Sequence, residues 1–528
     1  MNKFILCSLL VFAFLIRIIN FNFPAFTVEE ARLGARGYNL ESSGKDELGR
    51  NLPFIFNSLS DYQLPVTSYL VAFGELIFGS NDFGARLPFI LIGSLLTLLI
   101  YKITKQFIND EVVCLVAAFL TAISPTLVFL SKFPNQFLIE LFLLTLFFYF
   151  LTRVKFNIYI NSILLFLCDF TSKDFWITLP FFIFLVFVLN KDKQKLAKKK
   201  LIFLLFSLIF SLTLLVIFLN IPQGKRSLLE NNLSLFSSDT IRNGINKLRG
   251  QGNDFGIPYI LDRLLFNKTY FLIVGILNWL SSFSLSTYFG QFDSKGVFGF
   301  SQVGIWEKIL LIPFFLGIFN LLKKYSNPEK LLLFSILVLT FPAIFIYPGI
   351  SYSFFALTIP WSVIIIARGF KQMSYRWLFI ICLISLIELT LNIFFNYPET
   401  KNADFIRPTW IRQIALDTFT FSKKSKIFIS DNITDDLMPF IQWYNQSSLP
   451  SSSIVNFPYK FRETASGNIQ ILGSNQNLNP CYKYEKRQFI LSKRDLLNSE
   501  PFSPQVKKIY YDSLGQEVAY QVTYICLN

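Results

Sequence analysis

Two adjacent glutamates, Glu29 and Glu30, follow the first apolar segment of the chain in the string Phe26-Thr27-Val28-Glu29-Glu30-Ala31. A carboxylate held at such a place can take a proton from a hydroxyl group or bind a cation. The same string is also a capping box, because Thr27 precedes Glu30 by three residues and acids complement the dipole at a helix start. The catalytic and the capping interpretation are compatible, because a capped helix start holds a carboxylate in a fixed position.

Three cations form a second set, each near the end of an apolar segment. Arg86 precedes one segment, Lys132 lies in Ser131-Lys132-Phe133-Pro134-Asn135, and Lys173 lies in Thr171-Ser172-Lys173-Asp174. Such positions suit a phosphate group at the depth of lipid headgroups. The alternatives are that these side chains simply snorkel to an interface, or that Lys173 pairs with its neighbouring acids. The sequence leaves these alternatives open.

Composition excludes several kinds of chemistry. The 528 residues include no histidine, which rules out Ser-His-Asp and Cys-His nucleophiles, HExxH proteolysis and zinc held by histidine. The nearest string to a phosphate-binding GxxxxGK[ST] loop, Gly224-Lys225-Arg226, lacks the first glycine and the hydroxyl residue. Four of the six cysteines lie in apolar runs, whereas Cys481 and Cys526 lie in the polar C-terminal part. That pair is able to form a disulfide in an oxidising compartment.

The elements that position these residues are membrane helices. Hydrophobic residues make up 53% of the chain and charged residues 16%, against roughly 25% charged residues in soluble proteins. Eleven apolar runs approach the ~20 residues needed to cross a bilayer. They are Phe4–Asn20, Leu87–Tyr101, Val112–Leu130, Phe137–Leu151, Ile158–Phe170, Phe175–Leu189, Leu201–Leu219, Ile305–Leu322, Leu331–Tyr347, Phe354–Ala367 and Trp377–Phe395. We predict an α-helical polytopic membrane protein with about 11 transmembrane helices.

The basic residues orient the chain, since Lys and Arg in short loops stay on the cytoplasmic side. Alternate loops carry most of them, including the run Lys191–Lys200, whereas the opposite short loops contain only Lys132 and Lys173. We therefore predict a cell-membrane protein with a cytoplasmic N-terminus and an outer C-terminus. Tyr270–Phe289 is apolar enough to span, but counting it would break this charge rule. We interpret it as a helix in the outer interface.

This threading predicts two domains. Residues 1–395 form the membrane domain with outer loops 21–84 and 220–304, and residues 396–528 form a small extracytoplasmic α/β domain. Alternating apolar residues and turn signals predict strands in the tail. The predicted strands are Lys426–Ser430, Ser453–Phe457, Lys508–Tyr511 and Ala519–Val522, and Trp410–Phe419 has helical spacing.

The order of the motifs resembles the GT-C membrane glycosyltransferases, in particular the group of protein O-mannosyltransferases and bacterial lipid A aminoarabinose transferases. That group shows an acid-acid-Ala motif after the first span, a Pro-containing helix parallel to the membrane and an Arg-Leu-Pro that opens the second span. The matching strings are Val28-Glu29-Glu30-Ala31, Gly44-Lys45-Asp46-Glu47-Leu48-Gly49-Arg50-Asn51-Leu52-Pro53, Asp61-Tyr62-Gln63-Leu64-Pro65 and Arg86-Leu87-Pro88. The tail is similar only in kind.

The resemblance implies transfer of a sugar from a polyprenyl-phosphate donor lipid to an acceptor on the outer face, with inversion. The acceptor is a protein, a lipid or a cell-envelope glycan. Phosphate is a good leaving group, so one base and cationic neutralisation suffice, which a chain without histidine can supply.

The resemblance also assigns residues to roles. Glu29 takes the place of a catalytic base that is usually Asp in the family, and Glu30 shares the role. Lys132, Lys173 and Arg86 are the donor phosphate-binding candidates, and Asp61, Tyr62 and Arg50 are substrate-binding candidates. Glu140 is a secondary acid candidate, because Gln136 and Phe137 occupy the places where many relatives carry an acid.

Two other classes of function compete with this one. A transporter or flippase would line a path with ionisable residues near the bilayer midplane and often contains repeated halves, whereas this chain has few mid-span charges and no visible repeat. A non-catalytic scaffold whose tail binds a partner is the third. Glu29, Glu30 and Asp61 are able to hold a divalent cation through oxygen ligands, so a metal cofactor stays open, and we expect no nucleic-acid partner.

Overall fold

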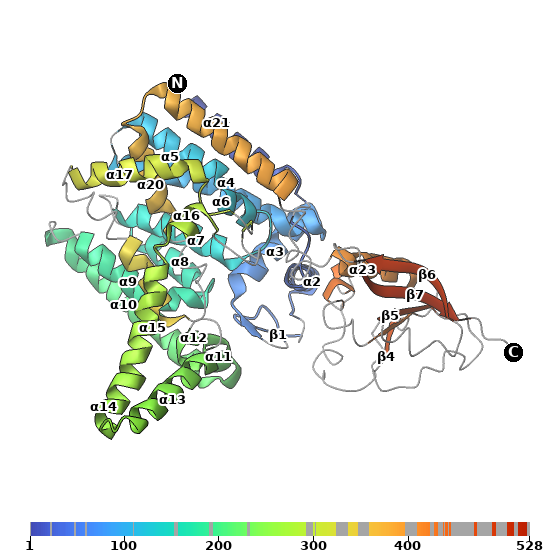
Figure 1. Cartoon of the computed structure of the whole chain (residues 1–528). Helices are drawn as coiled ribbons and strands as arrows, with labels where there is room; N and C mark the ends of the chain where they lie inside the picture. The colour runs from blue at the N-terminus through green and yellow to red at the C-terminus, as the bar shows by residue number, and fades with distance from the viewer. Residues whose placement is uncertain are drawn as a thin grey trace.

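The computed structural model describes residues 2–21, 24–46, 49–58, 61–108, 110–152, 157–189, 194–229, 233–291, 299–300, 303–323, 336–346, 358–396, 409–422, 427–430, 437, 439–441, 443–444, 469–472, 488–492, 504–511 and 516–524. Cys481, Cys526 and the predicted strand Ser453–Phe457 lie outside these residues, so the disulfide stays a prediction. A helical body carries a separate sheet at the C-terminal end (Figure 1).

The segment that we predicted as the first outer loop is folded around α2. Helix α1 (Asn2–Ile18) leads to α2 (Val28–Ser43), the hairpin β1 (Phe56–Ser58) and β2 (Asp61–Gln63), and α3 (Pro65–Phe78). The predicted capping box is present at the start of α2. The helix ends at Gly44 with φ 67°, a left-handed conformation that glycine adopts without steric cost.

A bundle of apolar helices follows, with polar caps at several starts. Its elements are α4 (Asp82–Phe107), α5 (Glu111–Ile123), α6 (Pro125–Leu130), α7 (Gln136–Thr152), α8 (Ile158–Asp169), α9 (Lys173–Leu189) and α10 (Gln194–Asn220). Asn81, Asp110 and Asn157 accept hydrogen bonds from backbone N–H groups at the starts of α4, α5 and α8, as N-cap residues do. The predicted span Val112–Leu130 is broken at Pro125, which cannot donate a helical hydrogen bond.

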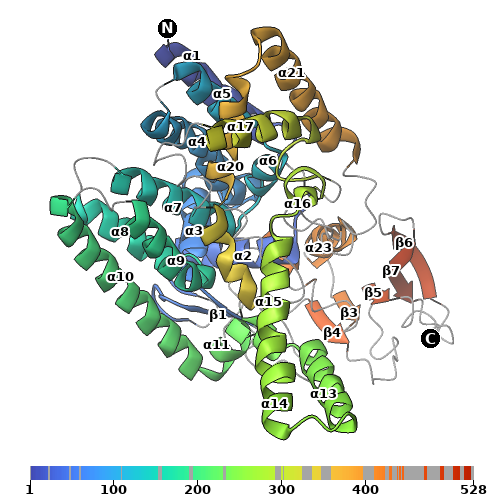
Figure 2. The same cartoon turned by 60° about the vertical axis from the view of Figure 1, so that its left-hand side comes forward.

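The segment that we predicted as the second outer loop forms an arm that stands out from the body in both views. It comprises α11 (Pro222–Ser227), α12 (Ser234–Ser237), α13 (Asp239–Asp254), α14 (Tyr259–Arg263), the π-helix η2 (Leu264–Thr269), α15 (Tyr270–Ser281) and α16 (Leu285–Phe289). Helix α15 runs between the body and the tip of the arm, where α13 and α14 lie (Figures 1 and 2). The segment 270–289 is long and apolar enough to span a membrane, so its predicted place in the outer interface stays a prediction.

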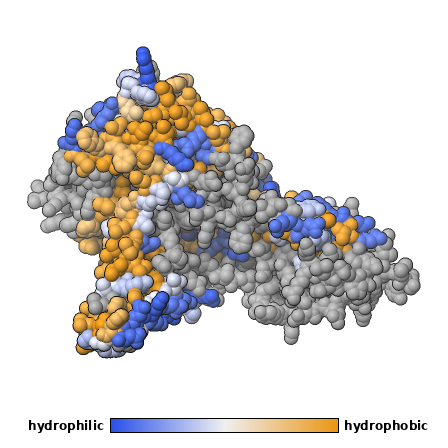
Figure 3. All heavy atoms as spheres, viewed as in Figure 1, coloured by the Kyte–Doolittle hydropathy of each residue, from blue (hydrophilic) through white to orange (hydrophobic). Residues whose placement is uncertain are grey.

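The last helices of the membrane domain pack closely. They are η3 (Lys308–Leu310), α17 (Leu311–Lys323), η4 (Phe341–Phe345), α20 (Ile359–Phe370), α21 (Tyr375–Leu391) and the π-helix η5 (Asn392–Asn396). Helix α17 lies against α20 so tightly that a Cβ at Gly369 would overlap the carbonyl group of Pro313. Large apolar side chains such as Phe319 and Phe379 stay exposed, and much of this face is hydrophobic (Figure 3).

The number of spans is not fixed by helix length. Among the described residues, three helical segments are long and apolar enough to cross a membrane, 82–107, 270–289 and 375–394. The other predicted spans are shorter apolar helices of 10–17 residues or lie partly outside the described residues. The predicted helical membrane fold is therefore confirmed in kind, and the count of eleven stays a prediction.

The tail is an α/β unit, as predicted. Helix α23 (Thr409–Ser422) precedes a five-stranded sheet of order β4-β3-β5-β7-β6. Its strands are β3 (Ile427–Ser430), β4 (Ile469–Leu472), β5 (Gln488–Ser492), β6 (Pro504–Tyr511) and β7 (Glu517–Tyr524). Strand β3 is parallel to β4 and β5, and β7 is antiparallel to β5 and β6. The described helix and strands confirm the predicted helix 410–419, the strand 426–430 and the hairpin of 508–511 with 519–522.

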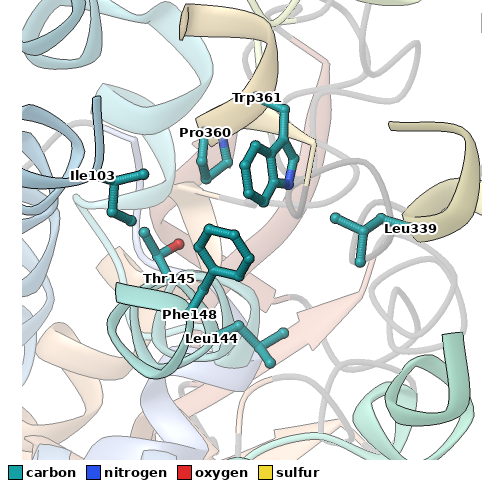
Figure 4. A pocket seen from close by; sticks show the side chains of 7 residues that line it. All are labelled: Ile103, Leu144, Thr145, Phe148, Leu339, Pro360 and Trp361. Atoms are coloured by element: carbon teal, nitrogen blue, oxygen red, sulfur yellow. The ribbon is translucent and has the colours of Figure 1, made fainter. Parts of the chain in front are cut away.

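A small cavity lies inside the helical body, between α4, α7, α20 and the segment 336–346. Its volume is about 20 Å³, room for about one water molecule. Figure 4 shows the rings of Phe148 and Trp361 next to each other in its wall, with the hydroxyl of Thr145 nearby. A sugar does not fit in this cavity.

Candidate functional site

Glu29 and Glu30 share the first turn of α2 but have opposite environments. The Glu30 side chain is 1% exposed, and its carboxylate accepts a hydrogen bond from Nε of Arg86 at 2.8 Å and forms an ion pair with its Nη2 at 2.7 Å. It also accepts from the backbone N–H of Thr27 in the capping box. The Glu29 side chain is 47% exposed and pairs with Arg32 at 3.1 Å. Of the two acids, Glu29 is the one that a substrate can reach.

Arg86 and Lys132 hold the end of α1. Arg86 donates to the carbonyl oxygens of Phe21 and Pro24 at 2.7 and 3.0 Å, and Lys132 Nζ donates to that of Ile19 at 2.7 Å. Carbonyl groups at a helix C-terminus lack helical partners and favour cations. Burial, with Arg86 and Arg17 nearby, lowers the pKa of Lys132 to about 7. Both side chains are 1% exposed, so their contact with a donor phosphate stays a prediction.

Gln63 connects Glu29 to a buried arginine. Its Nε2 donates to Glu29, and its Oε1 accepts from Nη1 of Arg36. Arg36 is fully buried, with its guanidinium 4.7 Å from the centre of the Phe56 ring. Glu29 is thus held from two sides, by Arg32 and by Gln63, at the helix end where the backbone dipole favours a carboxylate.

Lys173 follows the junction of α8 and α9, which is hydrogen-bonded to the chain just after Gln63. The N–H of Val66, three residues after Gln63, donates to the carbonyl oxygen of Phe170 at 3.3 Å. Lys173 opens α9, is half-buried, and has its Nζ 6.0 Å from the centre of the Phe218 ring of α10. Of the three cations that we predicted, it has the most accessible side chain.

A further cation comes from the segment after α10. Helix α11 contacts β2 and carries the exposed residue Lys225. Glu29 on α2 and Lys225 on α11 therefore belong to elements that both contact β2, through the Gln63 hydrogen bond and through α11. Nothing in the sequence joins Lys225 to Glu29, because the two are far apart along the chain and the neighbours of Lys225 form no motif.

The remaining predicted residues have other surroundings. Arg50 pairs with Asp46 at 2.6 Å and donates to the carbonyl oxygen of Ile55, so it closes its own loop. Asp61 and Tyr62 lie in β2, but their side chains fall outside what the structure describes. Their predicted substrate contacts stay predictions.

Glu140 lies inside the helical body. Its side chain on α7 is buried, and neither carboxylate oxygen has a hydrogen-bond partner among the described residues. It is within electrostatic range of Asp174, the neighbour of Lys173. The secondary acid candidate is thus buried inside the helical body, and its role stays a prediction.

Arg17 is a polar residue of this region that the sequence analysis did not single out. It is fully buried in α1 and donates to the carbonyl oxygens of Ala13 and Ala122 and to Oγ of Ser131. A charge inside an apolar segment is costly and usually has a function or a structural role, so the position of Arg17 in the first apolar run could have identified it. Gln63 and Arg36 do not lie in an apolar run, so this pattern could not have identified them.

A metal site is a separate question. Within the described ranges, no three His, Cys, Asp or Glu side chains lie close enough together to hold an ion. The divalent cation considered from the sequence therefore stays a prediction to be tested directly.

The chain is similar to one protein family model and to several solved structures. A family model described as dolichyl-phosphate-mannose-protein mannosyltransferase matches residues 63–219. No curated protein matches the chain. Among solved structures, ArnT from Cupriavidus metallidurans in the apo state is similar over 94% of this chain and 93% of its own, with 11% identity and a TM-score of 0.50.

Two further structures are similar at lower TM-scores. ArnT bound to undecaprenyl phosphate has 11% identity and a TM-score of 0.48 over 99% of this chain and 98% of its own. The archaeal oligosaccharyltransferase AglB from Archaeoglobus fulgidus, in complex with an inhibitory peptide and a dolichol-phosphate, has 15% identity and a TM-score of 0.43 over 84% and 64%. The family model and the apo ArnT fold confirm the resemblance to GT-C glycosyltransferases.

Proposed function

We propose that this chain, which has the GT-C fold, transfers a sugar from a polyprenyl-phosphate donor to an acceptor on the extracytoplasmic face, with inversion. The proposal is supported by the description of the matching family model and by the fold shared with apo ArnT. The two other structures are complexes with lipid phosphates, undecaprenyl phosphate for ArnT and dolichol-phosphate for AglB. We propose residues 1–395 as the catalytic membrane domain and 396–528 as the outer domain.

The observation that carries the proposal is the division between the two glutamates. Glu30 is buried against Arg86, whereas Glu29 beside it is 47% exposed and held by Gln63 and Arg32. A positioned and accessible carboxylate is what a general base requires. Because Glu30 has its charge satisfied in the interior, we assign the base to Glu29 and a structural role to Glu30.

The proposed reaction uses one base and cations. Glu29 takes the proton of an acceptor hydroxyl as that oxygen attacks the anomeric carbon of the donor sugar. The bond from this carbon to the phosphate oxygen breaks, and the polyprenyl phosphate leaves with the electron pair. We assign its charge to two accessible cations, Lys173 at the start of α9 and Lys225 on α11, which contacts β2, since fixed positive charge stabilises a leaving phosphate.

The test measures label transfer from undecaprenyl-phosphate-linked hexoses and pentoses into membranes of a deletion strain. We expect Glu29→Gln to lose roughly 10²- to 10⁴-fold in rate while the protein stays folded and inserted. Glu41→Gln is the matched control, an exposed acid on the same helix whose carboxylate accepts from Ser80. If Glu29→Gln keeps full activity, the assignment of the base to Glu29 is wrong, and if Glu30→Gln keeps it too, neither glutamate is the base.

Two supporting experiments address the donor and the metal. Mass spectrometry of the glycans and glycolipids that a deletion strain loses would identify sugar and acceptor together. Purified enzyme assayed with EDTA, and then with Mg²⁺ or Mn²⁺ restored, would test the divalent cation. Activity that falls with EDTA and returns with the metal would establish the requirement.

A further inference from the structure

The tail contacts the membrane domain through Asp82 at the start of α4. Its carboxylate accepts hydrogen bonds from Arg412 of α23, from Nε1 of Trp443 at 3.1 Å and from the hydroxyl of Tyr444 at 3.4 Å. Nε of Arg412 in turn donates to the Tyr444 hydroxyl at 2.8 Å. One aspartate thus receives three side chains that follow it by more than 300 residues.

A cavity of about 330 Å³ opens beside this contact. That volume lies within the roughly 300–1,000 Å³ of ligand sites in proteins. Its described walls include neither Glu29 nor any residue of the small apolar cavity of Figure 4. Besides Asp82, its walls include Phe21, Ser80, Phe83, Arg412, Trp443 and Tyr444.

The walls combine aromatic faces with one pair of opposite charges. Nη1 of Arg412 has no hydrogen bond to any residue in the described ranges, and the arginine side chain is 33% exposed. It therefore keeps N–H donors for a ligand, and Asp82, with 13% of its side chain exposed, keeps acceptor capacity. Because the two charges neutralise each other, an anion gains little here.

A sugar ring matches this combination. It has an apolar C–H face that packs on aromatic rings, and its hydroxyl groups both donate and accept hydrogen bonds. Small numbers of placed polar groups in a mainly apolar wall are typical of binding sites for such molecules. A phosphate would be attracted by Arg412 but repelled by Asp82, which forms an ion pair with that arginine.

We propose that this cavity binds a neutral saccharide, with the ring on the aromatic wall and its hydroxyl groups on Arg412 and Asp82. The inference rests on the proposed function, in which the cavity would hold sugar units of a glycan acceptor away from the reacting centre.

Trp443 connects the cavity to the helix that carries Glu29. Its ring stacks on Phe26 with centres 6.4 Å apart, and Phe26 lies under the guanidinium of Arg86. The same indole lies against α2 at Gly34, where a Cβ would be 2.8 Å from the ring. Trp443 is 2% exposed, so it is a positioning residue, which joins the wall of the cavity to α2.

The test is direct binding to the full-length protein in detergent. Isothermal titration calorimetry would use free mannose, N-acetylglucosamine, galactose and maltose, with inorganic phosphate as the anionic comparison. We expect saturable binding of at least one saccharide. Ser80→Trp should weaken it at least tenfold by filling the cavity while leaving the Asp82 contacts in place. Arg412→Gln should weaken it by a similar factor, and Tyr511→Phe, on the exposed edge of β6, should leave it unchanged.

The outcomes separate this inference from the proposed function. Glu29→Gln should abolish transfer and bind saccharide normally, because Glu29 is not in the cavity. If no saccharide binds, or if Ser80→Trp and Arg412→Gln both leave binding intact, the saccharide assignment fails while the catalytic one is untouched. Phosphate binding that Ser80→Trp removes, without saccharide binding, would make the cavity an anion site and overturn the proposal.

Discussion

Glu30 of α2 and Arg86 of α4 form an ion pair of 2.7 Å in which each side chain is 1% exposed. The pair joins the start of the helix that carries Glu29 to the start of a long apolar helix. Arg86 also fixes the chain between α1 and α2 through the carbonyl oxygens of Phe21 and Pro24. Three segments thus depend on one charge pair.

We expect Glu30→Gln to lower the free energy of unfolding by about 3–5 kcal/mol, since removing one partner strands a buried charge. Glu29→Gln should change it by less than about 1 kcal/mol, because its pair with Arg32 is exposed. Unfolding in mixed SDS micelles, followed by tryptophan fluorescence, measures both variants. Equal stabilities for the two would contradict the structural role of Glu30.

The contact between Trp443 and Gly34 predicts that α2 has no room for a larger residue at this position. In Gly34→Ala the new Cβ would be 2.8 Å from the indole, so the ring must shift and the tail should detach more easily. Limited proteolysis should release the tail several times faster than in the unmodified protein. Gly250→Ala on α13 is the control, because nothing lies within 4 Å of its added Cβ. An unchanged cleavage rate in Gly34→Ala would mean that the tail does not depend on this contact.

Glu75 makes stability depend on pH. It is fully buried in α3 without hydrogen-bond partners in the described part of the chain. Burial, with Glu41 nearby, raises its pKa from 4.5 to about 10. The folded state therefore binds more protons than the unfolded state between these two pKa values, and this contribution to stability is present below pH 4.5 and lost as pH rises toward 10.

We accordingly expect the free energy of unfolding to fall between pH 6 and pH 9 in the unmodified protein. In Glu75→Gln the slope should be smaller, and the variant should be the more stable protein at pH 9. Micelle unfolding across this range measures both. The same slope in both proteins would show that Glu75 does not titrate as the structure implies.

The predicted orientation can be tested with introduced cysteines in a protein whose native cysteines are replaced by alanine. An impermeant maleimide added to intact cells should not label Lys195→Cys, in the basic run 191–200. It should label Asp239→Cys, because that side chain on the outer arm is 86% exposed. Labelling with the opposite pattern would reverse the orientation.

Local patterns predicted the elements well, because their causes are local. The capping box at Thr27 and Glu30, the apolar helices and the hairpin of β6 and β7 depend on neighbours a few residues apart. The break at Pro125 was missed although its cause is also local, since the apolar run continues through it.

The partners of the charged residues were not predictable in the same way. Glu30 meets Arg86 after 56 residues, and Lys132 meets the end of α1 after 113. No motif joins such positions. From the sequence, Glu30 was therefore a candidate to share the role of the base and Lys132 a candidate phosphate ligand. Burial distinguishes them, and burial is a property of the packed chain.

The sequence by itself determined that this chain is a helical membrane protein with acids after its first span, because hydropathy and capping are written in adjacent residues. The tertiary structure decided which acid is accessible, which cations are already occupied by carbonyl groups, and that Asp82 receives the tail. These outcomes depend on which side chains reach each other once distant helices pack, and a linear pattern carries no record of that.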